Sequence, residues 1–153
     1  MTPRLRRVLK VSAIAIGVLG ALIFGCVEYV GGLADGMCGN YFLHDHVSPD
    51  GKLKVVVFQR DCGATTGFST QASLLAATKK LPNESGNIFV AIVPPGGARG
   101  PGGGPNLDVR WVAPQHLVLT HDQGTVVNLA QTQHSGVLIE YQHFGGDGRP
   151  VGR

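Results

Sequence analysis

The sequence predicts a mainly β protein: one small antiparallel β domain, sheet-like or sandwich-like, preceded by one N-terminal hydrophobic helix. Three observations predict it. An uncharged apolar run stands near the start of the chain, a strong hairpin signal lies between two cysteines, and short β-rich runs then recur between turn residues. The residues after the apolar run are enough for one domain with a modest core and too few for two.

The apolar run covers residues 11–27, which are 17 residues without a charge, and it extends to residue 30 as a transmembrane or signal-anchor helix. At about 1.5 Å per residue the run spans roughly 26 Å, close to the ~30 Å of a hydrocarbon core. Four cations precede it within residues 1–10, and the next cation is Lys52. The positive-inside rule therefore predicts a single-pass bacterial inner-membrane protein, with residues 1–10 cytoplasmic and the C-terminal domain periplasmic.

Three fates of this helix fit the sequence. The helix is retained as an anchor, or it is cleaved after Ala34, which follows small residues typical of a signal-peptidase site. In the third case, Cys26 is lipidated, because residues 23–26 faintly resemble a bacterial lipobox. All three place the same domain, residues 36–144, outside the cytoplasm.

The charge balance argues against a nucleic-acid partner. The chain has a formal net charge of +3, but four of its 13 Lys and Arg residues lie in residues 1–10, which leaves nine against ten Asp and Glu. Phosphate binding needs a concentrated basic surface. The expected partners are the membrane, through residues 11–30, and an envelope protein.

A hairpin centred on residues 48–51 predicts a disulfide. Pro, Asp and Gly in this order favour a tight turn, and a three-residue loop of residues 49–51 would pair Ser48 with Lys52. The same register sets Phe42 against Phe58 and places Cys38 opposite Cys62. Cross-strand neighbours lie within disulfide distance, and an exported domain meets oxidising conditions.

Beyond the hairpin, the pattern predicts an antiparallel meander with little helix. One helical turn before Pro82 is the ambiguous element, within residues 72–81. Val109, Trp111, Leu117 and Leu119 are expected in the core. The expected strands cover residues 53–59, 67–75, 87–93, 107–113, 116–120, 125–129 and 137–143.

Two segments are expected to lie outside the sheet. Residues 94–106 are almost all Gly and Pro, which cannot bury apolar surface, so we expect a flexible loop. No Gly-Lys-Ser or Gly-Lys-Thr follows them, which excludes a phosphate-binding loop. We also expect the tail, residues 145–153, to fray.

A few residues could carry chemistry. His44 and His46 would share one face of a strand, a spacing that suits two ligands of a transition metal, or they are simply a polar face beside the turn. The polar residues around the second cysteine offer a preorganised binding face, or they satisfy a buried turn. This candidate face comprises Arg60, Asp61, Thr65, Thr66 and Gln71.

The residues 48–52, 55–58 and 60–71, with 109–111 and 116–119, resemble a family of small bacterial exported proteins classed only as a domain of unknown function. The resemblance spans about residues 38–142, and the string RDCGATTGFSTQ is its most specific part. It implies an envelope location and a compact domain, and it carries no activity over.

The sequence therefore predicts a membrane-anchored envelope protein that is a non-catalytic interaction or structural module without a cofactor. Two other functions stay open: an envelope metal-binding protein that uses His44 and His46, and a hydrolase with its site between Asp61 and Gln71.

Overall fold

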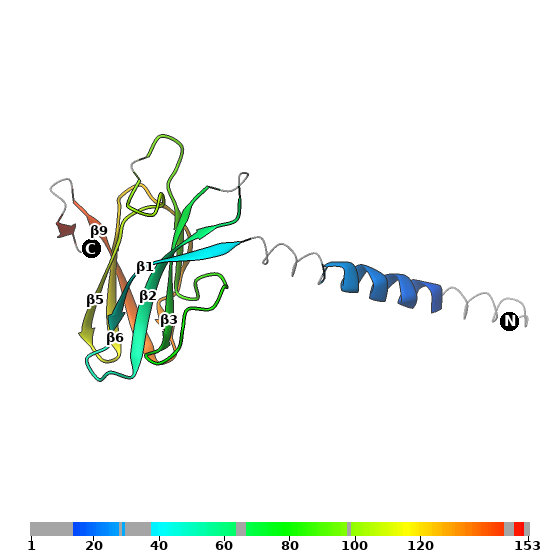
Figure 1. The fold of residues 1–153 in the computed structure, drawn as a ribbon, viewed down its shortest axis with the longest axis horizontal. Coiled ribbons are helices and arrows are strands. Elements are labelled where there is room, and N and C mark those ends of the chain that lie inside the picture. The colour runs from blue at the N-terminus through cyan, green and yellow to red at the C-terminus, as the bar shows by residue number, and fades with distance from the viewer. Residues whose placement is uncertain are drawn as a thin grey trace, which may run out of the picture. The chain divides into compact units, whose positions relative to one another are not determined.

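The computed structural model describes residues 14–27, 29, 38–63, 67–97, 99–145 and 149–151, and the chain divides into two compact units, Met1–Met37 and Cys38–Arg153. In the first unit, residues 14–27 form a helix (Figure 1), which confirms the N-terminal helix. No helix in the described part of the chain is long and apolar enough to cross a membrane. Residues 1–10 and Ala34 lie outside the described residues. Cys26 is an exposed free cysteine, and its lipidation stays a prediction.

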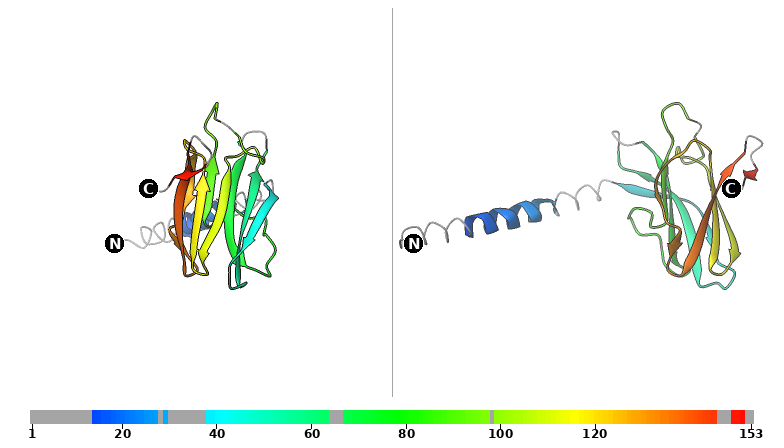
Figure 2. Two further views of the ribbon diagram at one scale, coloured as in Figure 1. Left: turned by 90° about the vertical axis from the view of Figure 1, so that its left-hand side faces the viewer. Right: turned by 180° about the vertical axis from the view of Figure 1, so that it is seen from behind.

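The second unit is a β-sandwich, which confirms the mainly β class (Figures 1 and 2). One sheet has the strand order β1-β2-β3-β4-β7, and the other has the order β10-β9-β6-β5, with β8 paired to β9. The strands are β1 Gly39–Val47, β2 Leu53–Asp61, β3 Ser69–Ala76, β4 Phe89–Ile92, β5 Leu107–Ala113, β6 His116–His121, β7 Val126–Ala130, β8 Gln133–His134, β9 Val137–Phe144 and β10 Pro150–Val151.

The expected antiparallel meander is wrong in its later strand order, because β4 pairs with β7 and not with β5, and because β6 and β9 pair in parallel. After β6 the chain leaves its sheet to add β7 beside β4 of the other sheet, and it returns through β8 to β9. A strand that re-enters a sheet after such a crossover can run in its neighbour's direction. The crossover brings the ends of β6 and β9 to the same edge of the sandwich.

The core lies between the two sheets and consists of the inward-facing residues of both. From the first sheet come residues such as Val57, Ala72 and Phe89, and from the second come residues such as Leu117 and Ile139, all nearly or completely buried. The four predicted core positions behave as expected: Val109, Leu117 and Leu119 belong to the core, and Trp111 packs against it.

The hairpin confirms the Cys38–Cys62 disulfide and corrects the turn that led to it. Phe42 faces Phe58 as predicted, but Val47 pairs with Lys54, so the turn contains one residue more than a three-residue loop and Ser48 does not pair with Lys52. A β-bulge between Phe42 and His44 absorbs that extra residue. The two errors cancel, and the register at the cysteines is the predicted one.

The four-residue turn is held by its own side chains. The Ser48 hydroxyl donates to Asp50 Oδ1 at 2.7 Å and accepts from the Leu53 amide at 3.0 Å, while the Gly51 amide donates to the Ser48 carbonyl at 2.9 Å. Gly51 has a φ of 72°, which a glycine adopts without strain. These bonds favour the longer loop over the three-residue alternative.

The structure decides the ambiguous segment of residues 72–81 and describes part of the tail, whose fraying stays a prediction. Residues 72–81 contain no helical turn: β3 continues to Ala76 and a hydrogen-bonded turn follows it. In the tail, Pro150–Val151 pairs with the end of β9, because the Gly145 amide and the Arg149 carbonyl close the connection at 2.6 Å. The two-residue strand β10 is too short to have the alternating apolar pattern by which a strand is found in a sequence.

Candidate functional site

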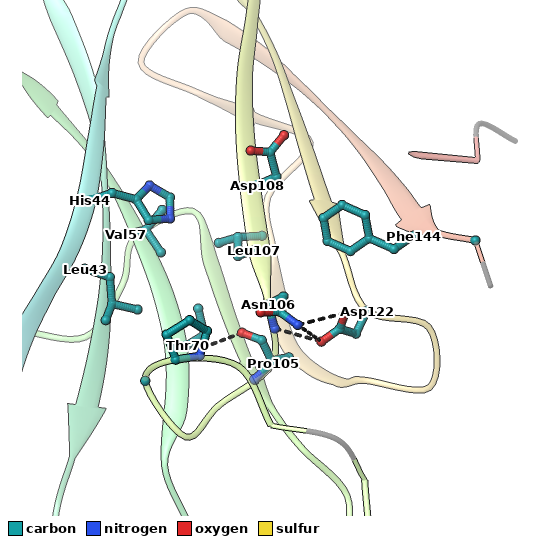
Figure 3. A pocket seen from close by; sticks show the side chains of 13 residues that line it. Leu43, His44, Val57, Thr70, Pro105, Asn106, Leu107, Asp108, Asp122 and Phe144 are labelled. Atoms are coloured by element: carbon teal, nitrogen blue, oxygen red, sulfur yellow. Dashed lines mark hydrogen bonds between the residues drawn. The ribbon is translucent and has the colours of Figure 1, made fainter. Parts of the chain in front are cut away.

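An open cleft of about 710 Å³ lies at one edge of the sandwich, between the two sheets (Figure 3). This volume lies within the usual range for small-molecule sites, roughly 300–1,000 Å³. Apolar side chains form its walls, and a few polar groups converge on it. It is lined by Leu43 and His44 of β1, Val57 of β2, Thr70 of β3, Pro101, Gly102, Pro105 and Asn106 of the connecting segment, Leu107 and Asp108 of β5, Asp122 after β6, and Phe144 and Gly145 at the end of β9.

The bulge in β1 is what supplies one wall. Successive residues of a regular strand point to opposite faces, so Leu43 and His44 would normally diverge. A bulge sets two residues against one on the neighbouring strand and re-aims their side chains. Here both Leu43 and His44 line the cleft. The same residue that corrects the hairpin register therefore shapes the site.

His44 brings an unsatisfied polar atom to this wall. Its Nδ1 is buried and has no hydrogen-bond partner among the described residues. Burial lowers the pKa of His44 below its usual value, and the charge of the neighbouring His46 lowers it further. A hydrogen bond to the Leu107 backbone and the carboxylates of Asp108 and Asp45 act in the opposite direction. The net effect favours a neutral imidazole at pH 7.

The Gly- and Pro-rich segment forms the floor of the cleft, and its second half is packed into the domain. Gly102, Gly104 and Pro105 are buried. A Cβ at Gly104 would lie 2.6 Å from the Thr70 amide nitrogen, and one at Gly102 would lie 3.1 Å from Leu43 Cδ1. The Thr70 hydroxyl donates to the Pro105 carbonyl at 2.7 Å. The expectation that this segment buries no surface is therefore wrong for Gly102, Gly104 and Pro105, and its flexibility stays a prediction.

Two carboxylates lie on the opposite side of the cleft. Asp122 is fixed, since its Oδ2 accepts from the Asn106 amide at 2.8 Å and from Asn106 Nδ2 at 3.0 Å (Figure 3). Asp108 is exposed. Its carboxylate makes no ion pair and no hydrogen bond among the described residues. No lysine or arginine is among the lining residues. Among the described residues, the cleft therefore has a negative side and no lysine or arginine in its lining.

The predicted binding face around Cys62 lies elsewhere, and two of its members are part of a buried network. Arg60 is 5% exposed and donates to Asn40 Oδ1 at 2.8 Å. Gln71, also 5% exposed, accepts from the Gly86 amide at 2.6 Å and donates to the Ser69 hydroxyl at 2.8 Å. The bond from the Gly86 amide to Gln71, with those from Asn40 Nδ2 to the carbonyls of Pro82 and Glu84, fastens the segment of residues 82–86 to the first sheet.

The other members of that face are only partly described. Asp61 Oδ1 accepts from the Gly63 amide at 2.9 Å, which stabilises the turn after the disulfide. Thr65 and Thr66 lie outside the described residues. The hydroxyls nearby hold the fold together, because Ser69 donates to the Arg60 carbonyl and Thr70 to that of Pro105. These contacts match the reading in which the polar string satisfies a buried turn.

The two histidines of β1 do come together, with their ring centroids 5.2 Å apart. Among the described residues, however, no group of three or more histidine, cysteine, aspartate or glutamate side chains could hold a metal ion. The backbone of His46 also has a structural role, since its carbonyl accepts from Trp111 Nε1 at 3.0 Å and links β1 to β5. His44 and His46 are therefore neighbours, but the described residues add no further ligand to them.

A second cavity, of about 630 Å³, is lined by β7 of the first sheet and β9 of the second sheet, and it contains His121, His143 and Tyr141. His121 and His143 are direct neighbours across the parallel strands, with ring centroids 4.5 Å apart. Burial lowers the pKa of His121 and raises that of Tyr141 well above its usual range. The Tyr141 hydroxyl lies 3.1 Å from the Ile88 carbonyl and 2.9 Å from that of Gln131, so it joins the two sheets.

No family model, curated protein or solved structure matches this chain. The resemblance to the exported bacterial family therefore stays a prediction. Of the cleft residues, His44 belongs to the predicted histidine pair, and Thr70 lies within the region from Asp61 to Gln71 that was considered for a hydrolase site. Asp108 and Phe144 gave no signal, and Asp122 entered only as one of several residues that could add a ligand to the histidine pair. Phe144 reaches the cleft because β6 and β9 pair in parallel, which depends on the crossover of β7.

Proposed function

We propose that this chain is an envelope protein whose disulfide-bonded β domain is a non-catalytic binding module for a small molecule. The observation that carries the proposal is the cleft of about 710 Å³ with apolar walls and converging polar groups. Open, largely apolar clefts with a few polar groups are the default binding sites of proteins. Non-catalytic binding fits best because the neighbouring Ser69 and Thr70 hydroxyls already have structural partners.

The envelope location rests on two supports of different kinds. The N-terminal sequence has a cationic flank before an apolar run, as in anchored and exported proteins. The domain has a disulfide between Cys38 and Cys62, a bond that persists mainly in oxidising compartments. Together they favour a domain that works outside the cytoplasm and is held near a membrane.

A thermal-shift screen of the full chain against a diverse library of small molecules tests this function. A ligand at one hundred times its dissociation constant adds about 2.7 kcal/mol to the unfolding free energy, a shift of several degrees. Leu43→Trp, which fills the cleft, should abolish the shift. Phe42→Trp is the matched control, because Phe42 is 60% exposed and does not line the cleft.

Three results would contradict the proposal. They are a library in which nothing stabilises the chain, a stabilisation that survives Leu43→Trp, and mass spectrometry that finds the bound compound converted to a product. The third result would leave a binding cleft but make the protein an enzyme.

A further inference from the structure

The polar groups that face the cleft share one hydrogen-bonding character. The carboxylates of Asp108 and Asp122 accept hydrogen bonds and carry negative charge. His44 also lines the cleft, but its unpartnered Nδ1 is a buried atom. The Thr70 hydroxyl uses its proton on the Pro105 carbonyl, which leaves its oxygen as an acceptor too. The Asn106 amide groups, the nearby donors, are turned toward Asp122.

The charge of the cleft points the same way. Two carboxylates line it, and no lysine or arginine of the described part of the chain does. Asp108 is the available one, because both Asp122 oxygens lie within hydrogen-bond distance of Asn106. An anion would meet uncompensated repulsion here, whereas an ammonium group could pair with Asp108 and donate to neighbouring acceptors.

The remaining walls are apolar. Leu43, Val57, Leu107 and Phe144 approach the cleft from four different strands (Figure 3). Such walls favour a ligand with an apolar body, and the face of an aromatic ring such as Phe144 also attracts a cation. A fully hydrated inorganic cation would leave this surface unused.

We infer that the ligand of this cleft is a small primary amine with an apolar body, whose ammonium group is held by Asp108 and whose body lies against Leu43, Val57 and Phe144. This inference rests on the proposed binding function and specifies its ligand class. The amine donates up to three hydrogen bonds, which matches a site built from acceptors.

Three probes of nearly equal shape test the inference: benzylamine, benzyl alcohol and benzoate, titrated into the full chain while backbone amide resonances of the cleft are followed by NMR. Benzylamine should bind at least about tenfold more tightly than benzyl alcohol, the usual size of a charge-assisted hydrogen bond. Benzoate should bind more weakly still. The affinity for benzylamine should fall as salt is raised.

Asp108→Asn is the decisive variant, and Glu84→Gln is its control. Both remove one negative charge from an exposed carboxylate, but Glu84 lies on the loop of residues 82–86 and does not line the cleft. Asp108→Asn should weaken benzylamine binding at least about tenfold, whereas Glu84→Gln should leave it unchanged. The probes also partition into the detergent in which the full chain is kept. This partition is the same for both variants, so the control accounts for it.

Two results would contradict the assignment of an amine ligand but leave a binding cleft. They are binding of the alcohol or benzoate as tight as that of benzylamine, and an Asp108→Asn variant with the wild-type affinity for benzylamine. If none of the probes shifts the cleft resonances, the amine is likewise overturned. The library screen with Leu43→Trp then decides the binding function independently.

Discussion

At the scale of single residues, glycine is what allows the connecting segment to close the cleft. Gly104 lies against β3 so closely that a Cβ there would be 2.5 Å from Thr70 Oγ1 and 2.6 Å from the Thr70 amide nitrogen. Its φ is not in the left-handed region, so the requirement is for space and not for an unusual backbone conformation. A run of glycines and prolines can therefore be packed structure, although its composition resembles that of a loose linker.

The first prediction follows from this contact. Gly104→Ala should lower the unfolding free energy by about 1–3 kcal/mol, the usual penalty for forcing atoms into a packed site. Gly67→Ala is the control, because no atom lies within 4 Å of a Cβ at that position. Urea denaturation of both variants measures the difference. Equal stability of Gly104→Ala and wild type would mean that residues 102–105 do not pack against β3.

A second prediction concerns the dependence of stability on pH. Burial lowers the pKa of both His44 and His121 in the folded chain; the charge of a neighbouring histidine adds to this, while nearby Asp108 and Asp122 partly oppose it. The folded chain therefore binds fewer protons than the unfolded chain, in which histidine titrates near 6.5. The unfolding free energy should fall as pH drops from about 6.5 through the lower folded-state values.

Urea denaturation at pH 7.5 and at pH 5.5 measures this effect. Replacement of both histidines by glutamine should flatten the decline. A wild-type unfolding free energy that is constant or rises between pH 7.5 and 5.5 would contradict the burial of these two imidazoles.

At the scale of elements, the sequence was informative where a pattern is local. Strand positions follow from alternating apolar runs, and the turn of residues 48–51 follows from its Pro, Asp and Gly. The bulge at Leu43 could not be predicted, because it has no composition of its own and arises from the mismatch between a four-residue turn and the cysteine register. The disulfide was predicted correctly only because the two errors in the hairpin compensate.

The crossover of β7 is the second element that sequence reasoning missed. A strand pattern says that a segment is extended and half-buried, but it does not say which sheet receives it. β7 could have stayed beside β6; instead it pairs with β4 and leaves β6 to pair with β9. Two of the cleft residues, Asp122 and Phe144, come together only through this choice.

At the scale of the whole molecule, the chain contains an N-terminal helix and a β-sandwich with a cleft, and a disulfide fastens the sandwich at the start of its first strand. The disulfide closes a loop with a sequence separation of 24 residues. A cross-link of this size stabilises a domain by about 3 kcal/mol, a large fraction of the stability of a small one. The sandwich is therefore expected to need oxidising surroundings, and this requirement links its fold to its proposed location.

Thiol mapping in intact cells tests this link most directly. Cells that express the full chain are treated with a membrane-impermeant maleimide, and the cysteine peptides are then identified by mass spectrometry. We predict that Cys38 and Cys62 are recovered joined to each other and unmodified, and that in a Cys62→Ser variant the impermeant reagent labels Cys38. Recovery of both wild-type cysteines as free thiols, labelled only after the cells are lysed, would contradict an exported, disulfide-bonded domain.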